Sequence, residues 1–136
     1  MNNLRLATIV HILVLADKFK DELITSDFIA SSINVNPVVV RREIQILKDA
    51  GILGSKKGKE GGCFLIKDTN LVTFGDVYQI ITKETDFIKK NQTNPACPIG
   101  KQMNVALDQI IEEAENSLIN KLKETTIKEF SNQFKL

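Results

Sequence analysis

The sequence predicts a mainly α-helical fold with one small β-hairpin, in which a winged helix-turn-helix domain precedes a long C-terminal helix. Two helical segments separated by a short turn are followed by a hairpin rich in glycine and lysine. The last third of the chain repeats apolar residues at helical spacing. A chain of 136 residues, 43% of them hydrophobic, is long enough for one ordinary core with an appended helical arm.

The first helices provide the core and the brace of the motif. Residues 4–19 are apolar nearly all round, which predicts a helix packed on several sides. His11 lies within this helix, and a histidine at the edge of an apolar face is a simpler interpretation than a metal or cluster ligand. Thr25 or Ser26 then caps a short helix over residues 26–33, in which Phe28, Ile29 and Ile33 are the expected apolar anchors. In a helix-turn-helix, such a helix braces the second one, which enters a groove of DNA.

The second helix of the motif begins at Pro37, because proline suits the first helical position and Asn36 can cap the free amides. Gly51 supplies its C-terminal stop. A buried stripe is expected at Val40, Ile44 and Leu47, widened by Val39, Ile46 and Ala50. At about 100° per residue, the opposite face carries Val38, Arg41, Arg42 and Gln45. This exposed face is mainly basic and hydrogen-bonding.

A hairpin follows this helix, with strands at residues 52–53 and 63–66 and a tip over residues 54–62. Its glycines allow close approach to another backbone, and its lysines, Lys56, Lys57 and Lys59, attract phosphate. A solvated hairpin end is the alternative interpretation. The neighbouring Arg41 and Arg42 favour the phosphate-binding one, because the chain has one clearly positive block.

The C-terminal part contains a helix over residues 74–82 capped by Thr73, and then a loop over residues 83–99. A long helix is expected from Gly100 onward, with an apolar stripe at Met103, Leu107, Ile110, Ala114, Leu118 and Leu122. Its length exceeds what so small a core can bury, which favours a seam between two copies; folding back on its own domain is the alternative. The tail over residues 125–136 is expected to form a short amphipathic helix that docks.

Composition narrows the function classes. A net charge of +1 argues against non-specific coating of nucleic acid but allows a local basic face. Two cysteines, no signal peptide and no apolar run long enough to cross a bilayer indicate a cytoplasmic protein with reduced thiols. One histidine, no phosphate-binding loop and no paired metal-ligand spacing give an enzyme little support.

The run A-G-I-L-G-S-K-K-G-K-E-G-G-C-F-L over residues 50–65 resembles the wing of the Rrf2 family of bacterial transcription regulators. The similarity extends over most of the chain, including T-F-G-D-V-Y-Q-I-I over residues 73–81. The resemblance implies a homodimer that binds double-stranded DNA at a roughly palindromic operator, and we expect a repressor. It places Val38, Arg41 and Arg42 at the bases and Lys57 at the minor groove. We expect Arg41, Arg42 and Gln45 to read major-groove edges, and the full set of expected DNA-binding residues is Asn36, Val38, Arg41, Arg42, Gln45, Lys56, Lys57 and Lys59.

The sequence departs from the family at the cysteines. Members that sense iron–sulfur status or nitric oxide carry three cysteines in the loop before the dimer helix, where this chain has only Cys97. Cys63 lies in the wing, where the family usually has an aromatic residue. We therefore expect a branch without an iron–sulfur cluster and with no metal site.

The signal is open at the level of sequence. Cys97, between Ala96 and Pro98 and near the start of the long helix, is a candidate redox switch, with Cys63 as a candidate disulfide partner across the dimer. A small apolar residue buried in a strand is the alternative interpretation of Cys63. Control by a small molecule or by an enzyme partner is the second option, and a winged-helix module that binds protein is the competing class. The predicted organisation is a DNA-binding domain over residues 1–82, a sensor loop over 83–99, and a dimerisation helix with its docking tail over 100–136.

Overall fold

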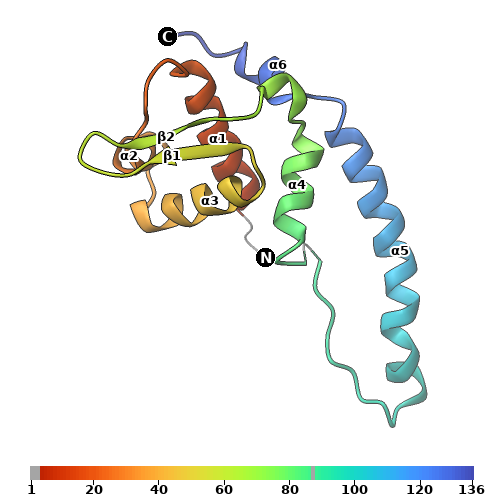
Figure 1. The fold of residues 1–136 in the computed structure, drawn as a ribbon. Coiled ribbons are helices and arrows are strands. Elements are labelled where there is room, and N and C mark those ends of the chain that lie inside the picture. Colours follow the sequence, from red (N-terminus) through yellow and green to blue (C-terminus); the bar gives the residue numbers. More distant parts are fainter. Residues whose placement is uncertain (1–3, 87) are drawn as a thin grey trace.

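The computed structural model describes residues 4–86 and 88–136; residues 1–3 and 87, which fall in the predicted DNA-binding domain and sensor loop, lie outside them. A body of short helices and one hairpin carries a long helix at its side (Figure 1). In chain order the elements are α1 (Arg5–Lys18), α2 (Ser26–Ile33), α3 (Pro37–Asp49), β1 (Leu53–Lys56), β2 (Gly62–Leu65), the 3₁₀ helix η1 (Thr69–Leu71), α4 (Phe74–Thr82), α5 (Pro98–Leu122) and α6 (Ile127–Ser131). The structure confirms the predicted fold class.

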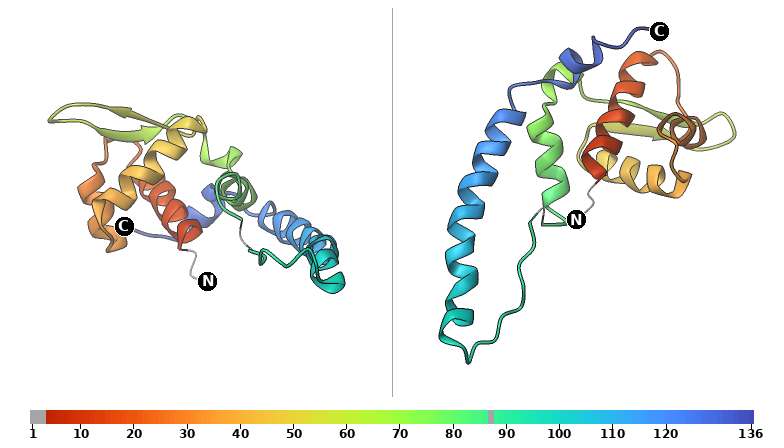
Figure 2. Two further views of the ribbon diagram at one scale, coloured as in Figure 1. Left: turned by 90° about the horizontal axis from the view of Figure 1, so that it is seen from below. Right: turned by 180° about the vertical axis from the view of Figure 1, so that it is seen from behind.

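Helix α1 is the centre of the body. Its apolar residues Ile9, Ile12 and Leu13 are fully buried, and α2, α3, α4 and α6 all pack against it. The view from behind shows α1 between the hairpin side and α4 (Figure 2). The helix is thus packed on several sides, as the nearly continuous apolar sequence of residues 4–19 predicts, while the face with Ala7, His11 and Leu15 stays exposed or partly exposed.

The predicted apolar anchors of α2 and α3 need correction. Val39 and Ala50 are exposed, so the buried stripe of α3 is narrower than expected. Glu43, which the apolar pattern passes over, is fully buried within that stripe. Phe28, expected as an anchor, is 42% exposed; its ring meets Phe19 edge-on, with ring centroids 5.6 Å apart, and does not enter the core.

The hairpin strands are longer on one side than the sequence suggests. β1 continues to Lys56, so part of the expected tip is strand, and the antiparallel register pairs Leu53 with Leu65 and Lys56 with Gly62. Outside the hairpin, the backbone of Ile24 exchanges hydrogen bonds of 3.1 and 2.8 Å with Cys63. The segment before α2 thus pairs with β2 and ties the hairpin to the helix-turn-helix.

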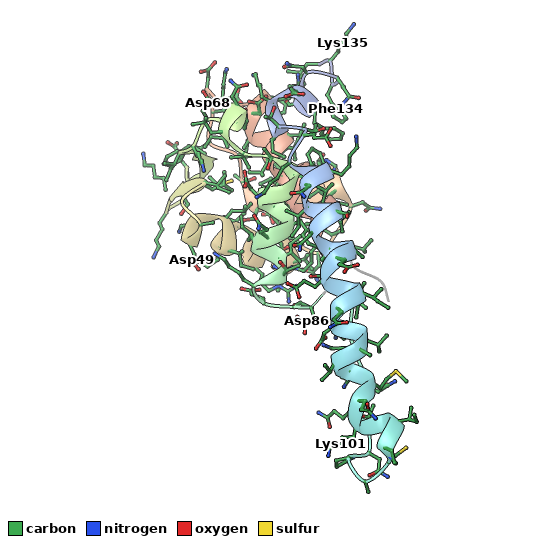
Figure 3. All side chains as sticks on the ribbon, turned by 90° about the vertical axis from the view of Figure 1, so that its right-hand side faces the viewer. Asp49, Asp68, Asp86, Lys101, Phe134 and Lys135 are labelled. Atoms are coloured by element: carbon green, nitrogen blue, oxygen red, sulfur yellow. The ribbon has the colours of Figure 1, made fainter. Side chains whose placement is uncertain are left out.

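Helix α5 begins at Pro98 and not at Gly100, because Cys97 already caps it through the backbone N–H of Gly100. Its C-terminal half packs against α4 near Gly75, where an added Cβ would lie 3.1 Å from the carbonyl oxygen of Ile119. Its N-terminal half extends past the body from about the level of Asp86 down to Lys101 (Figure 3). No residue of α5, all of which the structure describes, is buried.

The chain returns to the body after α5, as expected for a docking tail. Ile127 is fully buried, and its N–H donates to the carbonyl oxygen of Val72 at 2.7 Å. The carboxylate of Asp17 on α1 accepts hydrogen bonds from Thr69 at 2.9 Å and from Ser131 at 2.6 Å, and Lys128 lies 3.4 Å away. Asp17 therefore joins α1, η1 and α6. Burial alone would raise its pKa, but the hydrogen bonds from Ser131 and Thr69 and the charge of Lys128 outweigh burial and lower it.

Replacing Asp17 by alanine should lower the free energy of unfolding by about 2 kcal/mol at pH 7, because two buried hydroxyl donors lose their acceptor. A carboxyl whose pKa is lowered by folding stabilises above its unfolded pKa of about 3.9, and this contribution is lost as the pH falls through the folded pKa. The difference between the parent and the variant should therefore shrink below about pH 4 in denaturant titrations. The exposed Asp21→Ala should leave stability nearly unchanged; equal losses for both variants would contradict the prediction.

Candidate nucleic-acid interface

The start of α3 is built by its own local sequence. The side chain of Asn36 accepts a hydrogen bond of 2.9 Å from the N–H of Val38, and Pro37 occupies the first turn. Before it, Asn34 ends α2 in a left-handed conformation with φ of 65°, which reverses the chain between the two helices. Asn36 thus fixes where α3 begins. Its predicted contact with DNA stays a prediction.

The outer face of α3 carries the side chains that the sequence places there. Val38 is 65% exposed, and Arg41, Arg42 and Gln45 are also exposed. Two of them have local partners that the sequence analysis missed. Arg41 lies 3.8 Å from the carboxylate of Asp27 on α2, and Gln45 donates a 3.0 Å hydrogen bond to Asp49 one turn further along α3. Both contacts are between exposed side chains, so DNA can replace them at little cost.

A groove of about 480 Å³ separates α3 from the hairpin. Its basic lining residues are Arg41, Lys48, Lys56, Lys57 and Lys59. Gln45 also lines it, whereas Asn36, Val38 and Arg42 lie outside this lining. The structure therefore brings the predicted wing lysines and two of the predicted base-contacting residues to one hollow.

The rim of this groove also contains residues that sequence reasoning did not assign. Thr25 and Ser26 at the start of α2 line it, together with Asp27. Thr25 caps α2 by accepting a 3.1 Å hydrogen bond from the N–H of Phe28. The sequence shows that Thr25 and Ser26 lie at the start of α2. It does not show that they lie near the hairpin, because that depends on the pairing of Ile24 with Cys63.

The hairpin tip turns tightly over residues 57–61. Gly58 has a φ of 108°, a backbone conformation that residues other than glycine rarely adopt. A Cβ at Gly61 would lie 2.0 Å from the carbonyl oxygen of Lys56, so only glycine fits there. The two glycines hold the lysines of the tip on a narrow turn that a nucleic-acid backbone can approach closely.

The two thiols differ in environment. Cys63 is 2% exposed in β2, and burial raises its pKa to about 11. Cys97 is exposed at the start of α5, where hydrogen bonds from the backbone N–H groups of Gly100 and Ile99 lower its pKa. Both are free thiols within one chain, and a disulfide between Cys63 and Cys97 of two copies stays a prediction.

The described residues of a single chain do not fit a metal or cluster. Over residues 4–86 and 88–136, no group of three or more His, Cys, Asp or Glu side chains lies close enough to hold a metal ion. His11, considered as a ligand from the sequence, instead lies 2.9 Å from the hydroxyl of Ser32. The buried Cys63 and the exposed Cys97 also differ too much in environment to serve one common site.

The predicted dimer stripe on α5 is exposed over most of its length. Ile110 is 67% exposed, and Met103, Leu107, Ala114 and Leu118 are also exposed. Leu122 is half-buried near the end of the helix, where α5 lies against α4. The stripe is thus an unpartnered apolar face within one chain.

A family comparison matches nearly the whole chain. The model of the Rrf2 family, described as an iron-dependent transcriptional regulator, matches residues 3–133. The chain belongs to the Rrf2 family. This match confirms the family resemblance seen in the wing. Members of this family are transcriptional regulators and not enzymes. Although the description names iron, the described residues offer no metal site, as shown above.

Individual relatives agree with this assignment. The chain is 40% identical over 133 residues to YwnA of Bacillus subtilis, which is named among the HTH-type transcriptional regulators, covering 97% of this chain and 98% of that one. A crystal structure described as a DNA-binding protein is 38% identical, with a TM-score of 0.71 over 93% of this chain and 97% of the other. The cysteine regulator CymR of B. subtilis, 16% identical with a TM-score of 0.70 over 99% and 98% of the two chains, shares the fold.

Within the part of the chain that the structure covers, none of the helices has both the length and the apolar character needed to span a bilayer.

Alkylation should distinguish the two thiols in the folded protein. We expect Cys97 to react rapidly at neutral pH, because it is exposed and its pKa is lowered, and Cys63 to react only after unfolding. Mass spectrometry after iodoacetamide treatment, with and without denaturant, measures both sites. The variant Cys97→Ser should take up no label until denaturant is added; rapid labelling of Cys63 in the native parent would contradict the structure.

Proposed function

We propose that this protein is a sequence-specific DNA-binding repressor that acts as a homodimer. The observation that carries the proposal is the basic groove between α3 and the hairpin, where an exposed helix face and a glycine-bounded tip meet. Arginine and glutamine side chains can form paired hydrogen bonds with base edges in the major groove. Lysines on a tight turn supply charge that neutralises phosphates or enters the minor groove.

The residues of α3 and those of the wing are proposed to contact different parts of the DNA. Arg41, Arg42 and Gln45 project from the outer face of α3 and are proposed to contact bases, with Val38 adding an apolar contact near the helix start. The lysines of the wing, Lys56, Lys57 and Lys59, are proposed to bind the backbone, with Lys57 directed at the minor groove. Capped by Asn36, the first turn of α3 is held in one conformation for this contact.

The homodimer is proposed to form through α5. A helix of 25 residues with no buried residue leaves its apolar stripe in water, which a second copy of the same stripe would cover. A two-fold axis between the copies would present two basic grooves in opposite orientations. Such an arrangement matches a roughly palindromic operator.

The proposed signal is oxidation of the thiol at Cys97, which is exposed and has a lowered pKa. One of the similar solved structures is an oxidised form of Staphylococcus aureus CymR, but at 17% identity it supports the fold alone. The proposal therefore depends on the environment of Cys97. Control by a small molecule or an enzyme partner is the alternative, and it predicts that the oxidation state of Cys97 has no effect on DNA binding.

Binding of the purified reduced protein to its own upstream DNA tests the DNA interface. Replacing Arg41 or Arg42 by alanine should cost about 1–3 kcal/mol at the operator and relax base preference, because each arginine can pair with a guanine. Replacing Lys59 should weaken all DNA sequences similarly and reduce the salt slope by about 1. Fluorescence anisotropy across a salt series measures both quantities.

The control for these variants is Lys20→Ala, which removes an exposed positive charge outside the groove. Unchanged affinity and preference in both arginine variants would show that α3 is not the base-contacting helix. Repeating the assay after mild peroxide treatment tests the signal. If Cys97→Ser responds to peroxide as the parent does, the thiol switch is wrong and a separate effector must be sought.

A charge in the α5 stripe should separate the dimer. Ile110→Glu places a carboxylate at the centre of the exposed apolar face, and burying it between two copies would be costly. We expect light scattering after size exclusion to give the dimer mass for the parent and the monomer mass for this variant. Gln109→Glu adds the same charge on the other side of α5 and should stay dimeric. A dimeric Ile110→Glu would place the seam elsewhere.

A further inference from the structure

The inner side of the recognition helix α3 contains a charged residue where an apolar one would suffice. Glu43 is fully buried, and its neighbours on the same face, Val40, Ile44 and Leu47, belong to the core. A buried carboxylate is costly unless it is paired and hydrogen-bonded. Its pairing therefore fixes how α3 sits on the body.

Arg5, the first residue of α1, provides that pairing. Its Nε donates to both carboxylate oxygens of Glu43 at 3.3 and 3.1 Å, and its Nη2 donates to Oε1 at 3.1 Å. The side chain of Arg5 is only 17% exposed, so this is a largely desolvated arginine–carboxylate pair. Such a planar arrangement restrains both partners in orientation as well as in distance.

The same guanidinium also reaches a second acid. Nη2 of Arg5 lies 3.4 Å from Oε2 of Glu84, whose side chain is 54% exposed. Glu84 follows directly after the end of α4 and begins the segment that leads to Cys97 and α5. One nitrogen of Arg5 thus lies between the back of the recognition helix and the base of the predicted sensor loop.

The structure leaves room for this contact to change. A hollow of about 170 Å³ lies between the C-terminal half of α3 and the end of α4. Its lining residues are Ile46, Asp49, Ala50, Ile80, Lys83 and Glu84. Glu84 lines this hollow and is 54% exposed, so its side chain is not enclosed by the core.

We propose that Arg5 is a positioning residue for α3 and that Glu84 competes with Glu43 for it. When Glu84 holds Arg5, the restraint on Glu43 is weaker; when the loop withdraws Glu84, Arg5 holds α3 more firmly. Arg41 lies about 200° around the helix from Glu43, so a rotation set at Glu43 moves Arg41 at the groove. The consequence for DNA rests on the proposed function, whereas the competition within the chain does not.

Hydrogen exchange of the α3 amides in the full chain, without DNA, tests the competition. Glu84→Gln removes the competing charge and should slow exchange in α3 by about two- to five-fold, the range of a solvent-accessible ion pair. Arg5→Gln removes the positive charge that both acids share and should speed exchange by about tenfold. In the Arg5→Gln background, Glu84→Gln should have no further effect on α3.

The matched control is Glu22→Gln, which makes the same change at an exposed site. If Glu84→Gln behaves like this control, speeds exchange, or acts equally in the Arg5→Gln background, the competition is overturned. Should Arg5→Gln fail to fold by circular dichroism, Glu43→Gln serves as the second background, and there too the effect of Glu84→Gln should disappear.

Titration of the same variants with upstream DNA separates the two proposals. A parent that binds no DNA overturns the proposed function, while the exchange result still decides the role of Arg5. If the parent binds, Glu84→Gln should alter the affinity by about two- to five-fold, matching the change in exchange. An unchanged affinity in a variant with slowed α3 exchange would overturn the link between Arg5 and DNA.

Discussion

Packing of α1 against four other helices is the constraint on which the rest of the structure depends. Ile9, Ile12 and Leu13 are fully enclosed, and α2, α3, α4 and α6 each find their place by packing on this helix. A helix enclosed in this way cannot shift without opening several interfaces together. Polar residues at its two ends connect it to α3 and α6: Arg5 donates hydrogen bonds to Glu43, and Asp17 accepts one from Ser131.

Local signals predicted much of the fold because their causes are local. Asn36 and Pro37 start α3 as expected, and the glycines of the wing turn the hairpin where the sequence places the tip. What the sequence could not show was long-range pairing. Glu43 interrupts an apolar stripe, and its burial makes sense only with Arg5, 38 positions away. The groove likewise depends on the pairing of Ile24 with Cys63, which no periodicity encodes.

For helix α5, the sequence pattern predicted the helix but not which of its faces packs on the chain. Its apolar spacing was evident, but a stripe alone cannot tell which residues face the chain's own α4. The structure separates them: Ile111 and Ile119 are partly buried, whereas Met103 and Ile110 remain exposed. The helix also begins at Pro98, because the Cys97 side chain satisfies an amide that the apolar pattern does not register. An environment of this kind makes the same thiol both a cap and an accessible nucleophile.

The return of α6 to the body has a consequence for synthesis on the ribosome. Ile127 completes the core beside Val72, and Ser131 completes the hydrogen bonds of Asp17, yet both follow α5 in the chain. The body therefore cannot close until the long helix has already been made. A chain broken off within α5 would lack the closing helix α6, so its body would stay open to proteolysis.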